Sequence, residues 1–169
     1  MSFNLCFLFL FCGIILVDVI YIVSYMKGDV FMKCILMNKN TKVLCASYDS
    51  CNGVFSKVYD VYNILYAPYI LRSFYNKDNI NNNLFITNLT EWFRNRGIPS
   101  WRDKLDILLH RLNVTAPSEL LDKAFGLSLS DQYWIKPYDL DIKYDDINFF
   151  DNDFSYSEFL EASFSKDSN

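Results

Sequence analysis

The chain has 169 residues, of which 51% are hydrophobic and 18% aromatic, and its formal net charge is −4. This length suits a single domain with its own hydrophobic core. The acidic balance is atypical of proteins that coat nucleic acid, because those carry an excess of Lys and Arg. Its 5 cysteines are odd in number and form no C-x-x-C pair, which favours reduced thiols in the cytoplasm over a disulfide framework.

The N-terminal segment, residues 1–31, is separated from the rest by its composition. Residues 3–26 are almost wholly apolar, long enough for a bilayer span of about 20 residues. We expect either a transmembrane-like segment or a misassigned start. Met32 opens a strand-like run, and Lys27–Phe31 can be encoded by a purine-rich ribosome-binding sequence, so the misassigned start is favoured. A translated segment would instead give a single-pass membrane protein with a cytoplasmic C-terminal domain.

Three short apolar runs follow, and they predict a small antiparallel sheet. They cover residues 34–37, 43–46 and 54–65. Turn sequences separate them at residues 38–40 and 50–53, the second ending in a glycine that tolerates positive φ. The pattern indicates a hairpin followed by a third strand.

A polar connector over residues 76–83 precedes the first of three predicted helices. Asn88 and Glu91 have the spacing of a capping box, which predicts a helix from Asn88 to Gly97. Ser100 begins the second helix, whose leucines at i, i+3, i+4 and i+7 form one buried face: Leu105, Leu108, Leu109 and Leu112.

The third helix is predicted to start near Thr115 and Pro117 and to end with Gly126 as its C′ residue. Its inward-facing residues are Leu120, Leu121, Ala124 and Phe125. The aromatic run after Gly126 is expected to return as an extended segment packed on the helices. The fold class is therefore α+β, with a small N-terminal antiparallel β-sheet, a three-helix unit and an aromatic extended segment. A single domain is expected over 32–157 and a flexible tail over 158–169.

No residue pattern in the chain predicts a catalytic, cofactor-binding or metal site. His110 is the only histidine, and one histidine without matched Cys or His cannot form an ordinary structural zinc site. The acidic run after Asp139 lacks the glycine and the twelfth-position acid of a calcium loop. Large aromatic side chains are instead predicted to be structural or interface anchors: Trp92, Tyr133, Trp134, Phe149 and Phe150.

The predicted helices also allow a second interpretation. Two helices joined at Gly97 with basic residues around them are typical of a helix-turn-helix DNA reader of mobile-element type. Its candidate nucleic-acid contacts are Arg94, Arg96, Arg102, Lys104 and Arg111. Acidic residues interleave with them at helical spacing, which favours a solvated outer face instead.

Three motifs in order carry a resemblance to a known family. They are the W-x-x-x-R-x-I-P element from Trp92 to Pro99, the run from Gly126 to Pro137, and the segment from Asp146 to Ser155 with its Asn-Phe-Phe. Together they resemble the N-terminal region of HipA-like kinase-type proteins of Firmicutes and their phages, over roughly residues 32–157. The resemblance implies a sheet-plus-helix module that precedes a Ser/Thr-kinase-like domain.

In such proteins the phosphoryl-transfer residues follow the Asn-Phe-Phe element, so no catalytic residue can be carried over to this chain. We expect a non-catalytic docking or regulatory module, the product of a truncated gene or a stand-alone accessory protein. We expect it to have no cofactor. Its expected partner is a protein, either a kinase-like domain or another chain. Nucleic acid is a less favoured partner, and a membrane is a partner only if residues 3–26 are translated.

Overall fold

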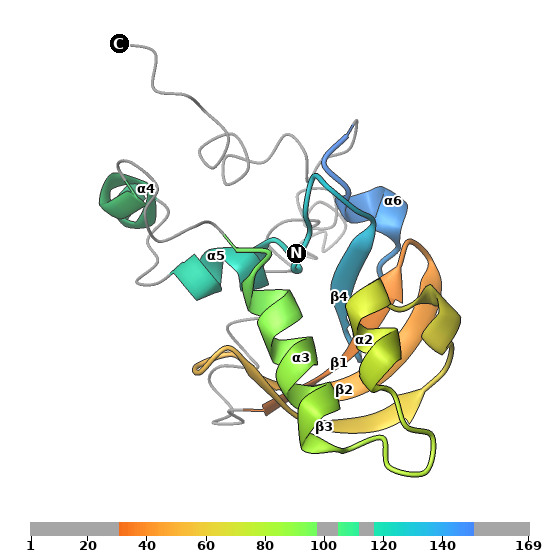
Figure 1. Ribbon diagram of the computed structural model, residues 1–169. Helices are drawn as coiled ribbons and strands as arrows, with labels where there is room; N and C mark the ends of the chain where they lie inside the picture. The colour runs from red at the N-terminus through yellow and green to blue at the C-terminus, as the bar shows by residue number, and fades with distance from the viewer. Residues whose placement is uncertain (1–30, 98–104, 112–116, 151–169) are drawn as a thin grey trace, which may run out of the picture.

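A four-stranded antiparallel sheet organises the protein. The computed structural model describes residues 31–97, 105–111 and 117–150. The strands are β1 (Phe31–Asn38), β2 (Thr41–Asp49), β3 (Val54–Val61) and β4 (Tyr133–Pro137), in the spatial order β3-β2-β1-β4. Every neighbouring pair is antiparallel (Figure 1). The α+β class with an N-terminal sheet is confirmed.

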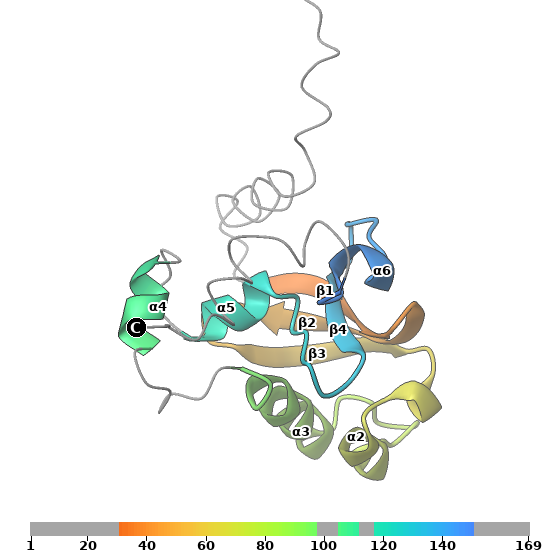
Figure 2. The ribbon, with the colours of Figure 1, turned by 90° about the horizontal axis from the view of Figure 1, so that it is seen from above.

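Two helical layers flank this sheet. On one face lie α2 (Tyr69–Phe74) and α3 (Asn83–Arg94), and on the other lies the short α6 (Tyr144–Ile147), as Figure 2 shows. A 3-10 turn, η2 (Ile64–Tyr66), leads into α2. The remaining described helices are α4 (Leu105–Arg111) and α5 (Pro117–Lys123).

Strand alternation divides the core between the two faces. On β1, Cys34 and Leu36 pack in the larger cluster with α3 residues such as Phe85. Ile35 and Met37 point the opposite way, into a smaller cluster with Trp134 and Ile147. Successive side chains of a strand point to opposite faces, so one apolar run supplies both layers.

The aromatic segment was expected to pack on the helices, and its strand pairing was not predicted. Residues 133–137 form β4, which pairs with β1 and extends the sheet by one strand. Tyr133 and Ile135 do face the helical layer, but Trp134 faces the other side. These side chains face opposite sides because residues 133–137 form a strand, in which successive side chains alternate between the two faces of the sheet. The strand hydrogen-bonds to the edge of β1 that β2 leaves unpaired.

Side chains from the helical layer satisfy part of the outer edge of β3. The Asn81 side chain accepts a bond from the Val58 N–H at 2.7 Å and donates one to the Val58 carbonyl at 2.9 Å. The Thr90 hydroxyl accepts a bond from the Phe55 N–H at 3.0 Å. These contacts occupy backbone groups that would otherwise be free to pair with another chain.

The prediction that the first helix starts at Asn88 is wrong. The helix α3 begins at Asn83, and Asn82 is its N-cap, with a side chain that accepts a bond from the Phe85 N–H at 2.8 Å. Asn88 lies inside the helix and donates from its side chain to the Leu84 carbonyl. The polar connector was predicted to run to residue 83 but ends at the N-cap Asn82, because the apolar spacing of Phe85, Leu89 and Phe93 extends the helix backwards by more than one turn.

Several predictions concern residues outside those described. They are the apolar segment 1–30, the start of the second helix at Ser100, Leu112 on its apolar face, and the tail 158–169. On α4 itself, Ile107 and His110 are exposed and Leu109 is half-buried. No helix among the described residues has the length and apolar character needed to cross a bilayer.

Candidate functional site

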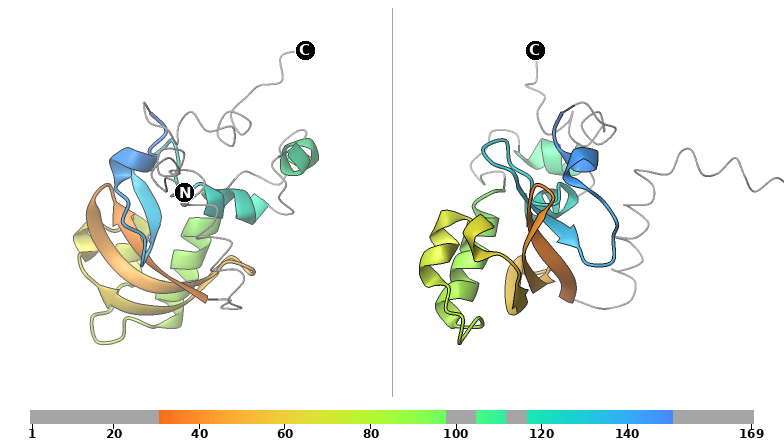
Figure 3. Two further views of the ribbon diagram at one scale, coloured as in Figure 1. Left: turned by 180° about the vertical axis from the view of Figure 1, so that it is seen from behind. Right: turned by 90° about the vertical axis from the view of Figure 1, so that its right-hand side faces the viewer.

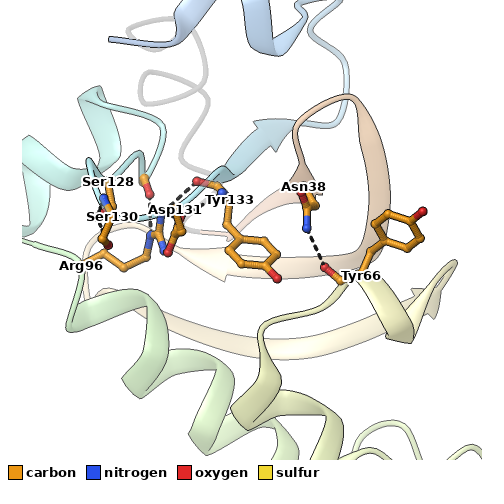
Figure 4. Close-up of polar contacts among 8 residues, drawn as sticks. Asn38, Tyr66, Arg96, Ser128, Ser130, Asp131 and Tyr133 are labelled. Carbon is orange, nitrogen blue, oxygen red and sulfur yellow. Dashed lines mark hydrogen bonds and ion pairs between the residues drawn. The ribbon is translucent and has the colours of Figure 1, made fainter.

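A cluster of polar contacts surrounds Arg96, just after the end of α3. Its side chain is only 5% exposed. The guanidinium forms a bidentate pair with the Asp131 carboxylate, at 2.6 and 2.7 Å. It also donates to the backbone carbonyls of Gly126 at 2.7 Å and Tyr133 at 2.9 Å (Figure 4). We call these four residues the Arg96 latch.

Each hydrogen bond of the Arg96 latch joins the end of α3 to the segment between α5 and β4. The Gly126 and Tyr133 carbonyls belong to the two ends of the loop between α5 and β4, and Asp131 belongs to the loop itself. A bidentate arginine–carboxylate pair is directional as well as strong. The arrangement holds this loop against the end of α3, so its chemistry is structural.

The predicted anchors Trp92 and Tyr133 complete the same region. Their rings meet edge to face, with centroids 5.7 Å apart and an interplanar angle of 89°. The guanidinium carbon of Arg96 lies 4.6 Å from the centre of the Trp92 ring. Both rings are half-buried, so they are packing residues with one edge at the surface.

Trp134 is the most deeply anchored of the predicted residues. It is fully buried, and its indole Nε1–H donates to the Lys39 carbonyl at 2.7 Å. The ring meets Phe125 edge to face at 6.5 Å. Lys39 is the positive-φ residue of the β1–β2 turn, so Trp134 fixes that turn from β4, the strand next to β1.

The remaining two anchors lie just after α6 and differ from each other. Phe149 is half-buried against the cluster around Trp134 and Ile147. Phe150 is 67% exposed. Of the two, Phe149 is therefore placed as a packing residue and Phe150 as a surface residue.

Gly126 is shifted by one position from the predicted C′ role. The Gly126 N–H bonds to the Leu121 carbonyl at 2.8 Å, and the Phe125 N–H bonds to the Asp122 carbonyl at 3.0 Å. These are the two bonds of a Schellman motif in which Phe125, with φ of 53°, is the left-handed C′ residue. Gly126 follows it as C″ with φ of 65°.

Two of the five candidate nucleic-acid contacts are engaged within the chain. Arg96 belongs to the latch described above. Arg94 donates to the carbonyls of Gly53 at 3.0 Å and Asn52 at 2.7 Å, which holds the β2–β3 turn. Arg102 and Lys104 lie outside the described residues, and the side chain of Arg111 on α4 is not described. The helix-turn-helix interpretation therefore stays a prediction, and Arg94 and Arg96 are less available to contact DNA because both bond within the chain.

The turn that Arg94 holds is also stabilised by a carboxylate. Asp49 accepts bonds from the side chain of Asn52 at 2.6 Å and from its backbone N–H at 3.1 Å. The Asn52 side chain is the main cause of a lowered pKa at Asp49. The glycine predicted to end this turn, Gly53, has φ of 64°.

Within the described part of the chain, no group of three or more His, Cys, Asp or Glu side chains could hold a metal ion. Cys34 and Cys45 are buried and Cys51 is exposed, all as free thiols. Burial raises the pKa of the Cys34 thiol well above its usual range. In the acidic run, Asp146 caps the Lys143 N–H at 2.9 Å and Asp145 bonds to the Asn40 side chain at 3.3 Å.

Sequence reasoning missed η2 and α2, and with them an exposed apolar surface. Leu65 is 73% exposed and Tyr69 is 81% exposed, and Tyr66 and Ile70 are about half exposed. We call these four residues the η2–α2 surface. The third strand was predicted to extend to residue 65, but β3 ends at Val61, residues 64–66 form η2, and Pro68 is the N-cap residue of α2. A proline at a helix start is a known signal that could have found this helix.

The described residues define a small α+β domain, a four-stranded antiparallel sheet with helices on both faces and an arginine-centred latch. No protein-family profile, no curated protein and no solved structure matches this chain. The resemblance to HipA-like proteins therefore stays a prediction from the three motifs.

Proposed function

We propose that the protein is a non-catalytic docking module whose partner is a kinase-like protein domain. The observation that carries the proposal is the η2–α2 surface, where four large apolar side chains within six residues are exposed to solvent. Contiguous exposed apolar surface is a feature of sites where proteins bind one another. The three HipA-like motifs supply the chemical class of the partner.

Buried side chains and hydrogen bonds fix the backbone of the segment that carries this surface. Ala67 and Leu71 are fully buried in the larger core cluster. The Arg72 side chain donates to the Ala67 carbonyl at 2.8 Å. The Asn38 side chain donates to the Tyr66 carbonyl at 3.2 Å (Figure 4). A fixed backbone keeps the exposed side chains in one arrangement, which lowers the entropic cost of binding.

The Arg96 latch supports a non-catalytic role. Its donors are directed at backbone carbonyls and at the Asp131 carboxylate, all of which belong to the fold. A group that acts on a substrate must reach it with a free donor, acceptor or lone pair. The three motifs therefore correspond to structural anchors in this proposal, and the duplex-DNA reader is the alternative.

Association with a HipA-type kinase-like protein of the same host tests the proposal. We expect the full chain and that protein to form a complex on size exclusion and by calorimetry. Tyr69→Asp should weaken binding at least about tenfold, because it places a charge in a desolvated contact. The matched control is Ile107→Asp on α4, another exposed apolar residue, which should bind as the unaltered chain does.

Three results would contradict the docking proposal. The first is the absence of a complex at micromolar concentrations. The second is equal weakening by Tyr69→Asp and Ile107→Asp. The third is robust ATP hydrolysis or autophosphorylation by the chain alone. Specific retention of duplex DNA at moderate salt would favour the alternative.

A further inference from the structure

The sheet has a second surface feature on the face opposite α2 and α3. The strand register places Lys33 of β1 opposite Ser47 of β2, and Ser47 opposite Lys57 of β3. Paired residues point to the same side of a sheet, so the two lysines share this face. Ile35, two residues from Lys33, packs in the cluster on this side.

Tyrosine rings surround these lysines. The Lys33 ammonium lies 3.8 Å from the centre of the Tyr138 ring and 5.3 Å from that of Tyr59. The Lys57 ammonium lies 5.2 Å from Tyr59, and the Lys42 ammonium lies 6.0 Å from Tyr62. The lysine–tyrosine face is defined by these six residues: Lys33, Lys42, Lys57, Tyr59, Tyr62 and Tyr138.

The three rings remain accessible, one on β3 and the other two just after the ends of β3 and β4. Tyr59 is 47% exposed, Tyr62 46% and Tyr138 43%. Seen from behind, α6 lies over the β4 side of this face, and on this side no described helix covers β3, whose other side packs against α3 (Figure 3). Cation–π contacts hold the rings in place without burying them.

The face is positively charged on a chain whose net charge is −4. Within the described residues, no carboxylate lies within 4.0 Å of the ammonium groups of Lys33, Lys42 or Lys57. Asp60 of β3 is paired with Cys45 and so lies on the same face, where its carboxylate accepts the Val61 N–H at 2.8 Å. The three lysines outnumber this one carboxylate. Three cations without an ion-pair partner are complementary to an anionic ligand.

We infer that the lysine–tyrosine face binds single-stranded nucleic acid, with phosphates on the lysines and bases stacked on the tyrosines. Exposed aromatic rings beside backbone-tracking positive charge are the general means by which proteins bind single strands. The broad face of a sheet also suits unstacked bases, whereas duplex DNA is read by an element that enters a groove.

An acidic peptide is the less favoured occupant, for reasons of geometry. Peptides bind to a sheet edge, in a groove or against clustered arginines. The lysine–tyrosine face lies on the broad side of the sheet and contains no arginine. Lysine binds as a point charge, which suits separate phosphates better than the bidentate recognition of carboxylates.

The experiment is a fluorescence anisotropy titration of the full chain with labelled oligothymidylate of about 15 nucleotides, at about 50 mM salt. We expect the single strand to bind at least about tenfold more tightly than the matching duplex. With three phosphate contacts, log K should fall with log salt at a slope of about −2.

Paired variants separate stacking and charge from folding. Tyr59→Ala should weaken binding about tenfold, whereas Tyr59→Phe keeps the ring and should bind within about twofold of the unaltered chain. Lys33→Glu should also weaken binding about tenfold. The control Lys77→Glu changes an exposed lysine in the loop between α2 and α3, on the other side of the sheet, and should have no more than a small effect.

Three outcomes would overturn the inference. One is no binding of the single strand at this salt concentration. Another is equal binding of single strand and duplex. The third is displacement of the oligonucleotide by polyglutamate as effectively as by unlabelled oligothymidylate, which would indicate an acidic-peptide site. Tyr69→Asp should leave this binding unchanged, so the docking proposal and this inference can fail independently.

Discussion

At the residue scale, the end of α5 contains two consecutive positions with positive φ, and only the second is a glycine. Phe125 adopts the left-handed conformation at a cost of about 1 kcal/mol. Its burial against Trp134 and the bond of its carbonyl to the Ile135 N–H at 2.7 Å offset that cost. Gly126 is required for a further reason, since a Cβ there would lie 2.4 Å from a ring carbon of Phe93.

Gly126→Ala is therefore predicted to destabilise the fold by about 3 kcal/mol, from the left-handed backbone and the collision with the Phe93 ring together. Chemical denaturation measures this change. Gly53→Ala is the matched control, because Gly53 also has positive φ but its added Cβ would meet nothing nearer than 3.7 Å. We expect the control to cost about 1 kcal/mol. Equal losses in the two variants would show that the contact with Phe93 contributes nothing.

At the scale of elements, the start of α3 shows what a local sequence signal can and cannot decide. Asn82, Asn83 and Asn88 are all plausible caps by residue type. The Asn88–Glu91 spacing looked like a capping box, yet Asn88 lies in the helix interior. Asn82 caps the helix because Phe85 and Leu89 are drawn into the core and the chain must turn before them. Its side-chain amide also donates to the carbonyls of Phe74 and Asn79, at 3.3 and 3.0 Å.

Asn82→Ala should lower the free energy of unfolding by about 1–2 kcal/mol, since it removes the N-cap bond and the bonds to the preceding loop. Asn88→Ala serves as the comparison and should change stability by less than about 0.5 kcal/mol, because alanine is favourable inside a helix. Thermal unfolding followed by circular dichroism gives both values. A larger loss of stability from Asn88→Ala than from Asn82→Ala would contradict the assignment of Asn82 as the N-cap.

At the scale of the whole molecule, a buried thiol links stability to pH. Cys34 lies at 0% exposure on β1 and donates to the Ala46 carbonyl, with 3.6 Å between sulfur and oxygen. Burial, followed by the nearby Cys45 and Asp122, raises the pKa of this thiol in the folded state. In the unfolded chain the Cys34 thiol loses its proton at about pH 8.5, whereas in the folded chain this thiol keeps its proton. Above that pH the unfolded state binds fewer protons, so stability must fall as pH rises.

Cys34→Ala should flatten this alkaline loss. We expect the unaltered chain to lose about 1.4 kcal/mol per pH unit from this thiol above about pH 8.5. Urea denaturation at several values between about pH 8 and 9.5 measures the slope, before most tyrosines ionise. Cys51→Ala, at an exposed thiol, is the control and should keep the unaltered slope. A slope that is the same in all three proteins would contradict the assignment.

The sequence by itself determined that three strands come first, where the two turns between them lie, and that a helix ends just before Gly126. These depend on alternation, on glycine and on caps, which act over a few residues. Only the tertiary structure decided that residues 133–137 pair with β1, that Asn82 rather than Asn88 starts α3, and that Arg96 binds Asp131. Those outcomes depend on residues 35 to about 100 positions apart, where the competition for a strand edge, a core position or a buried charge is settled by packing.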